Sequence, residues 1–254
     1  SNTTWSSNQT INGVLTINNN VQLTIANNVT INADSIRLND RARIVVNNSN
    51  YTLQINTSGS VQLISRNHIT SGNIVIDAES LSLNSSSYIQ PSSALTIEAD
   101  TSVSLTSSSY FNSGAINITA TDLTLNSSCY IRPASNRTLT VNTSGTTTLQ
   151  NSSRMDLGEI DINTNNLQLI SSSRIQSVSG FPLVLDVTGT LTLNSSAYIT
   201  ASNNNVMINA DNLSMNSNCY IESSSGRTMT VNVDDTMTMA GNSNTRLRYG
   251  TINL

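Results

Sequence analysis

The side chains best suited to binding chemistry in this sequence are tyrosines and arginines that recur at intervals of 20 to 26 residues. Each directly precedes an apolar residue, as in C-Y-I at 129–131 and S-R-M at 153–155. In a strand, this alternation turns the Tyr or Arg outward and its two neighbours inward. The resulting candidate binding ladder comprises Tyr88, Tyr110, Tyr130, Arg154, Arg174, Tyr198, Tyr220 and Arg246.

Aromatic and cationic side chains in such a row have two uses. We expect the first three tyrosines to stack, and three Tyr–Arg neighbours to form cation–π contacts. These neighbours are Tyr130–Arg154, Arg174–Tyr198 and Tyr220–Arg246. Under one interpretation the contacts only stabilise adjacent strands. Under the other, the row is a flat strip that binds a sugar polymer or a partner filament.

Catalytic chemistry has little support in the sequence. Acid–base cleavage of a polysaccharide needs clustered carboxylates, or a basic residue over a bound calcium ion. Asp234 and Asp235 are the best acidic pair, and we expect them in a solvated turn. The single histidine, His68, belongs to the outward column beside Arg43 and Tyr88 as a surface residue. We therefore expect no enzyme activity, no metal site and no cofactor, although acids that recur near one corner leave a weak calcium site open. These acids are Asp34, Asp77, Asp100, Asp122 and Asp211.

The two cysteines, Cys129 and Cys219, occupy the same position in their repeats. They lie four repeats apart, or about 19 Å if each repeat rises by the spacing of paired strands. A disulfide cannot span that distance. Ser and Ala fill the same position in other repeats, so we expect the cysteines to be free, small and buried.

The chain contains few basic residues, and this argues against partners that are strongly anionic. The 254 residues include 11 Arg and no Lys, and the net charge is −4. We therefore expect no binding of nucleic acid or of an anionic membrane. No apolar run is long enough to span a bilayer. Asn, Ser and Thr number 38, 42 and 32. Such a polar composition is compatible with a fold here because the apolar residues are strictly patterned.

A sequence repeat predicts the strands that position the ladder. Nearly the same nine residues occur as LSLNSSSYI at 81–89, LTLNSSCYI at 123–131, LTLNSSAYI at 191–199 and LSMNSNCYI at 213–221. Triplets of the forms I-x-I, L-x-L and x-Y-I advance together, with apolar residues at every second position. This pattern predicts an all-β fold: a single-stranded, right-handed parallel β-helix, or β-solenoid, with three short strands per coil and about ten coils of 20–26 residues.

The corner after each L-x-L triplet carries an asparagine that we expect to stack from coil to coil through its side-chain amide. These asparagines are Asn84, Asn126, Asn194 and Asn216. The first three also begin Asn-x-Ser sequences and are candidate N-glycosylation sites. Just beyond the corner, a tight inward slot takes only small residues: Ser87, Ser109, Cys129, Ser153, Ser173, Ala197 and Cys219.

We divide the chain into two parts. Residues 1–28 have shorter and less regular spacing, and we expect a cap or lead-in segment whose Trp5 covers the first coil. Residues 29–254 are expected to form the β-helix, open at its C-terminal end because a new strand begins at Ile252. Exposed strand edges at the ends of a solenoid favour self-association.

The L-T-L and I-T-V strands and the N-S-S corners resemble the β-helical shafts of bacterial filamentous haemagglutinins and autotransporter passenger adhesins. The resemblance covers roughly residues 29–254 and implies an extracellular or cell-surface location. We therefore expect a structural protein, a shaft or filament subunit that assembles head-to-tail through its ends and acts in adhesion. The alternative is a glycan-binding module that uses the ladder to bind a surface polysaccharide.

Overall fold

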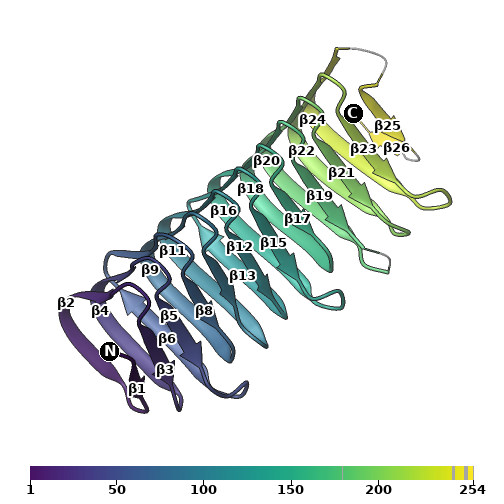
Figure 1. Cartoon of the computed structure of the whole chain (residues 1–254). Helices are drawn as coiled ribbons and strands as arrows, with labels where there is room; N and C mark the ends of the chain where they lie inside the picture. The colour runs from purple at the N-terminus through teal and green to yellow at the C-terminus, as the bar shows by residue number, and fades with distance from the viewer. Residues whose placement is uncertain (179, 242–243, 249–250, 254) are drawn as a thin grey trace. The chain divides into compact units, whose positions relative to one another are not determined.

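The predicted all-β fold is confirmed. The computed structural model (Figure 1) describes residues 1–178, 180–241, 244–248 and 251–253, the last three by their backbone. These residues form strands joined by turns, and no helix is found among them. They divide into two compact units, Ser1–Thr121 and Asp122–Leu254. Each unit is a parallel β-solenoid, and the two together contain about 11 turns.

The first unit contains two parallel sheets. Its short-strand sheet runs in the order β1 (Thr3–Trp5), β3 (Gln22–Ile25), β5 (Arg43–Val46), β8 (His68–Thr70), β10 (Tyr88–Gln90) and β12 (Tyr110–Ser113). Its long-strand sheet contains β2 (Gln9–Ile17), β4 (Val29–Leu38), β6 (Thr52–Thr57), β7 (Ser60–Leu63), β9 (Asn73–Leu83), β11 (Ala94–Thr106) and β13 (Ala115–Ala120).

The second unit repeats this arrangement. Its short-strand sheet runs in the order β15 (Tyr130–Pro133), β17 (Arg154–Asp156), β19 (Arg174–Ser177), β21 (Tyr198–Ala201), β23 (Tyr220–Ser223) and β25 (Arg246–Arg248). Its long-strand sheet contains β14 (Asp122–Asn126), β16 (Thr138–Gln150), β18 (Glu159–Ile170), β20 (Leu183–Asn194), β22 (Val206–Asn216), β24 (Met229–Ala240) and β26 (Thr251–Asn253).

The register of the strands follows the columns of the repeat. Tyr88 is paired with His68 on one side and with Tyr110 on the other. Arg154 is paired in the same way with Tyr130 and Arg174. Equivalent positions therefore lie directly above one another, which is the condition for any side-chain ladder on the outer surface.

The core is a stack of aliphatic layers inside each unit. Alternate residues of the strands are almost completely buried; Ile97, Phe111, Leu169 and Ile199, for example, are all 0% exposed. Burial of each such side chain contributes about 1.5–3 kcal/mol relative to leaving it in water. The partly buried residues between them face outward, so the period of two in the sequence becomes an inner and an outer surface.

The tight slot is confirmed as an inward position. Ser87, Cys129 and Ala197 are each 0% exposed. The Ser87 hydroxyl donates to the carbonyl oxygen of Asn84 at 2.7 Å, and the Cys129 thiol donates to the Asn126 carbonyl at 3.0 Å. The slot therefore admits only a small side chain, and a Ser or Cys there also donates to the carbonyl oxygen three residues earlier.

The prediction of three separate strands per coil needs refinement. In most turns the first two strands are continuous, and the linkers expected to be turns lie inside β16 and β20, among others. The register shifts where the long strand bends, for instance between Thr143 and Thr146. Such a bulge redirects a strand without ending its pairing. Among the described strands, β6 and β7, and β13 and β14, are the pairs that are separate at this corner.

The N-S-S corners turn through two successive residues with left-handed backbone conformation. Ser85 and Ser86 have φ angles of 51° and 62°, and Ser127 and Ser128 have φ angles of 63° and 64°. Asn218 takes the second of these positions in a later turn, with φ 67°. This conformation costs most residues roughly 1–2 kcal/mol and is easier for Asn. The corner therefore depends on small polar residues.

Side-chain amides were expected to stack at this corner, but they stack more regularly on the long-strand sheet. At the corner, Asn151 donates to Asn126 at 2.8 Å, one residue out of the predicted column. The more regular amide ladder lies on the outer side of the long-strand sheet of the second unit. There Asn163 donates to Asn142 at 3.3 Å and Asn232 donates to Asn209 at 2.7 Å. Strand register, and not corner position, brings these amides within reach.

Residues 1–28 contain strands of the same two sheets. Thr3–Trp5 is paired with Leu23–Ile25, and β2 is paired with β4. The segment is thus built on the same plan as the coils that follow. Its role as a cap stays a prediction, as do the right-handed sense of the coil and the open C-terminal end, whose last residue, Leu254, lies outside the described residues.

Candidate functional site

The candidate ladder lies on the outer face of the short-strand sheets. In the first unit, the His68 ring stacks on Tyr88 with centroids 5.0 Å apart and an interplanar angle of 10°. Tyr88 stacks in turn on Tyr110 at 4.7 Å and 2°. Strand pairing sets this spacing, because neighbouring strands lie about 4.8 Å apart. All three side chains are half-buried.

The second unit combines arginines with tyrosines, in the order Tyr130, Arg154, Arg174, Tyr198, Tyr220 and Arg246. The Arg154 guanidinium lies 4.7 Å from the centroid of the Tyr130 ring, and that of Arg174 lies 6.0 Å from the centroid of Tyr198. Tyr198 and Tyr220 stack at 4.9 Å and 2°. The predicted cation–π pairs are therefore present, including that of Arg246 over Tyr220 at 4.8 Å.

This geometry restricts how a ligand could use the ladder. Tyr88 lies between His68 and Tyr110, and Tyr220 lies between Tyr198 and Arg246. The faces of these rings are thus occupied by their neighbours. A sugar ring approaching from solvent would meet ring edges, phenol hydroxyls and guanidinium N–H groups. Recognition would depend on hydrogen bonds more than on stacking.

His68 is a neutral member of the ladder near pH 7. Burial lowers its pKa below the usual value, and the positive charge of Arg43 lowers it further. Arg43 is the register partner of His68 on the preceding strand. Both effects disfavour the imidazolium form. The ring accordingly acts in the ladder as an aromatic group and not as a cation.

An ion cluster that the sequence analysis missed lies beside the ladder. The Asp156 carboxylate, only 8% exposed, accepts two hydrogen bonds from Arg132: Nε to Oδ1 at 2.8 Å and Nη2 to Oδ2 at 3.0 Å. Arg154 Nε and Arg174 Nη2 lie 3.0 and 3.5 Å from Oδ2. The hydrogen bond to Asp156 raises the pKa of Arg132. The available signal was alternation: Arg132 and Asp156 each follow a ladder residue by two positions.

The acidic residues considered for catalysis or calcium binding are dispersed. Asp234 and Asp235 are exposed and lie within β24, so their expected place in a turn is wrong. Their strand continues through a bulge, because pairing with β22 resumes at Thr236 after a register shift that follows Val233. Asp34 and Asp77 line an open groove of ≈ 290 Å³. Among the described residues, no three His, Cys, Asp or Glu side chains are grouped so as to hold a metal ion.

Both cysteines are buried and neither is in a disulfide, as predicted. The Cys219 thiol donates to the carbonyl oxygen of Asn216 at 2.8 Å. Burial raises the pKa of Cys219, and hydrogen bonds to backbone groups only partly offset this effect. A thiol with a raised pKa contains little of the reactive thiolate at neutral pH. Cys219 is therefore a packing residue.

The three candidate glycosylation sites differ in exposure. Asn84 is exposed, whereas Asn126 and Asn194 are half-buried. The side-chain oxygen of each accepts a hydrogen bond from the following serine, at 3.2, 3.0 and 3.2 Å respectively. Glycosylation of these residues stays a prediction, and Asn84 is the most accessible of the three.

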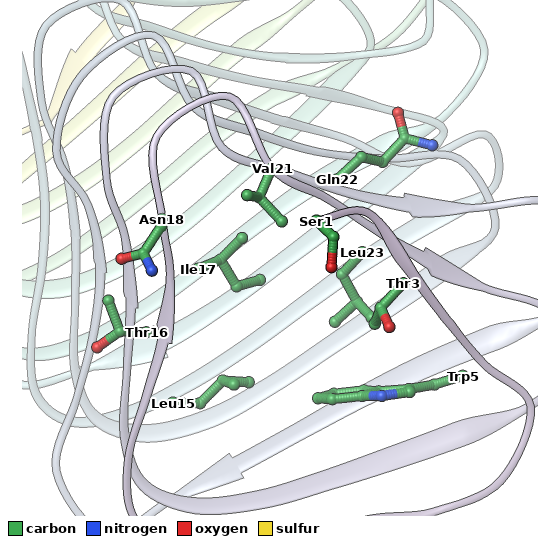
Figure 2. A pocket seen from close by; sticks show the side chains of 10 residues that line it. All are labelled: Ser1, Thr3, Trp5, Leu15, Thr16, Ile17, Asn18, Val21, Gln22 and Leu23. Atoms are coloured by element: carbon green, nitrogen blue, oxygen red, sulfur yellow. The ribbon is translucent and has the colours of Figure 1, made fainter.

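A small apolar pocket lies at the start of the first unit (Figure 2). Its volume is ≈ 210 Å³, and its apolar lining includes Trp5, Leu15, Ile17 and Leu23. Figure 2 shows the Trp5 indole edge-on, level with Leu15 and below Ile17 and Leu23. The pocket is thus the interior of the first turn, lined by residues of β1, β2 and β3 among others.

Comparisons with known proteins give no relative. The chain matches no protein-family model, no curated protein and no solved structure. The resemblance to haemagglutinin and autotransporter shafts therefore rests on the repeat pattern alone. Within the described part of the chain, no helix is both long and apolar enough to cross a bilayer.

Proposed function

We propose that this chain is an extracellular structural β-solenoid, a shaft or filament subunit that acts in adhesion at a cell surface, and that it is not an enzyme. The observation that carries the proposal is the use of both strand faces for contacts between turns. Inward residues such as Ile97 and Leu169 build the core. Outward residues such as Tyr88 and Asn163 contact the equivalent residue of an adjacent turn. Such nearest-neighbour contacts suit a load-bearing repeat.

The surface location rests on composition and on the repeat. The strands and N-S-S corners resemble those of secreted haemagglutinin and autotransporter shafts. The chain also contains no Lys. Proteases that cleave after Lys therefore find no site, which favours persistence outside a cell. Fractionation of the native source, with detection of the chain in the surface or culture fraction, tests this part of the proposal.

Head-to-tail assembly is the most testable part. Among the described strands, β2 pairs only with β4 and so has one free edge. The Ile17 carbonyl accepts from the amide of Asn39, so Ile17 faces β4 and the backbone N–H of Thr16 faces the other way. Thr16→Pro would remove that outward donor while sparing the pairing with β4. Thr16→Val, which keeps the N–H, is the matched control.

Negative-stain electron microscopy and sedimentation velocity measure the outcome. We expect filaments that lengthen with protein concentration for the original sequence and for Thr16→Val, and short particles for Thr16→Pro. Monodisperse monomers of the original sequence at all concentrations would contradict filament assembly.

A glycan-binding function of the ladder is the second candidate. It is favoured by the regular spacing of Tyr198 and Tyr220 and by the cation above each end of this pair, Arg174 and Arg246. Since the ring faces are occupied, the phenol hydroxyls would make the contacts. The double variant Tyr198→Phe/Tyr220→Phe keeps the stack and removes the hydroxyls. Tyr51→Phe, outside the ladder, is the control.

Binding to a panel of immobilised neutral and acidic polysaccharides tests this candidate. A ligand that is retained by the original chain and by Tyr51→Phe, but lost by the double variant, would support it. If the double variant retained the ligand as well as the original chain does, the ladder hydroxyls would not be part of the binding site.

A further inference from the structure

The ion cluster around Asp156 contains more positive charge than its carboxylate neutralises. Arg132, Arg154 and Arg174 supply three positive charges and Asp156 one negative charge, so the cluster has a net charge of 3 − 1 = +2. In the described part of the chain, the ion pairs of these three arginines all end on Asp156. The chain as a whole has a net charge of −4. The cluster is therefore a local reversal of sign.

The hydrogen-bond donors of the cluster are also in excess. Arg132 occupies both carboxylate oxygens with its two-pronged contact. Arg154 and Arg174 both reach the same Oδ2, Arg154 through Nε at 3.0 Å and Arg174 through Nη2 at 3.5 Å. Each guanidinium carries five N–H donors and no acceptor. One carboxylate cannot satisfy three such groups, so N–H donors remain for a second oxyanion at the exposed part of these side chains.

The arginines are held in place before any ligand arrives. The guanidinium groups of Arg132 and Arg154 lie 5.2 and 4.7 Å from the centroid of the Tyr130 ring, and that of Arg174 lies 6.0 Å from the centroid of Tyr198. The side chains of the three arginines are 32%, 25% and 31% exposed, so they are confined but still open to solvent. Guanidinium groups fixed on aromatic rings lose little entropy when they bind a carboxylate or sulfate.

We propose that Arg132, Arg154 and Arg174 form a binding site for a carboxylate or sulfate group of an acidic polysaccharide, with Asp156 as the internal carboxylate that orients Arg132. The charge excess, the excess of N–H donors over a single carboxylate and the partial exposure of the three arginine side chains carry this inference. It deepens the glycan-binding candidate by naming an acidic ligand, and it does not depend on filament assembly. A small free anion presents the same chemistry, and the experiment separates the two sources.

The test is equilibrium binding of the full chain to four probes: citrate, sulfate, polygalacturonate and neutral dextran. Arg174→Gln is the main variant, because Arg174 makes the longest contact to Asp156 and its loss leaves the Arg132–Asp156 pair intact. Arg154→Gln is the second variant. Arg137→Gln, at an exposed position, is the control for nonspecific charge. Circular dichroism verifies that every variant keeps its β structure.

We expect polygalacturonate to bind the original chain and Arg137→Gln equally, dextran to bind neither, and Arg174→Gln to bind about tenfold more weakly. Binding of citrate or sulfate without polygalacturonate would support the oxyanion site but overturn the polysaccharide as its ligand. The site itself would be overturned if no anion bound the original chain. It would also be overturned if Arg174→Gln and Arg154→Gln bound polygalacturonate as tightly as the original chain. Such a result would leave the binding of neutral glycans by the Tyr198 and Tyr220 hydroxyls untouched. The arginine site and the tyrosine site are therefore tested separately.

Discussion

Tyr88 lies face to face with Tyr110, with ring centroids 4.7 Å apart and ring planes 2° from parallel. On its other face Tyr88 meets the His68 ring at 5.0 Å. Exposed aromatic side chains are usually free to change rotamer, whereas this one is enclosed on two sides by the next turns. The ladder is therefore a part of the stability of the solenoid as well as a candidate binding surface.

Replacement of Tyr88 by Ala removes both stacking contacts. We expect the free energy of unfolding to fall by about 1–3 kcal/mol, since one aromatic pair contributes about 0.5–1.5 kcal/mol beyond its buried area. Tyr88→Phe keeps the stack and should differ little from the original. Urea unfolding followed by circular dichroism measures both variants. A midpoint for Tyr88→Ala equal to that of Tyr88→Phe would show that the stack contributes nothing.

The lowered pKa of His68 predicts a pH dependence of stability. The folded state resists protonation of this ring, because of its burial and of Arg43. The unfolded chain takes up a proton near the ordinary pKa of about 6.5. The unfolded state thus binds more protons in this range, and stability must fall as pH falls through about 6.5, down to the lowered pKa of the folded state.

His68→Tyr isolates this effect, because His68 is the only histidine of the chain. A tyrosine at 68 can stack on Tyr88 without titrating in this range. We expect the urea midpoint of the original chain to decrease from about pH 7.5 to pH 5.5, and that of His68→Tyr to stay nearly constant. Parallel decreases in the two proteins would assign the pH dependence to other groups.

The amide ladder of the second unit is interrupted at Asp186. Asn209 donates to the Asp186 carboxylate, but Asp186 has no N–H to donate to Asn163, its partner on the preceding strand. The charge of Asp186 also adds to burial in raising the pKa of Asp161. Asp186→Asn should complete the ladder and raise the free energy of unfolding by about 1 kcal/mol. Asp186→Ala removes the acceptor of Asn209 and should lower it; thermal unfolding at pH 7 compares the two. A lower melting temperature for Asp186→Asn than for the original would contradict this role.

Gly114 marks a close approach between two turns. A Cβ atom at this position would lie 1.8 Å from the backbone oxygen of Ser93. Gly114→Ala must displace backbone, and we expect a loss of about 2–4 kcal/mol in unfolding free energy. Gly226→Ala is a control for backbone strain alone, because its Cβ would meet nothing within 4 Å while its φ is +78°. Its expected loss is about 1 kcal/mol. Equal losses in urea unfolding would mean that the contact with Ser93 is easily relieved.

The sequence predicts the fold and the ladder well because one constraint sets both. A period of two places Ile89 inward and Tyr88 outward, and the repeat then stacks each Tyr or Arg on its equivalent. The continuous long strands were not predicted. Thr143, Ser144 and Gly145 have the composition of a turn, but their strand stays paired to its neighbour and bends at a bulge.

The ion cluster escaped prediction for a different reason. Arg132 and Asp156 follow ladder residues by two positions, so their outward direction was readable. Their contact, however, depends on an arginine side chain that reaches across from one strand to a carboxylate on the next. A pattern of alternation gives the direction of each side chain, but not which long side chains converge.

The slot shared by Ser87, Cys129 and Ala197 has a consequence for the search for relatives. It selects for volume and leaves the identity of the residue open. The N-S-S corners likewise accept either of two short polar types. Two descendants of one ancestral chain could therefore lose most of their identical positions while every coil still closed. Homology among such proteins is better detected from the periodic pattern of side-chain volume along the chain than from residue identity.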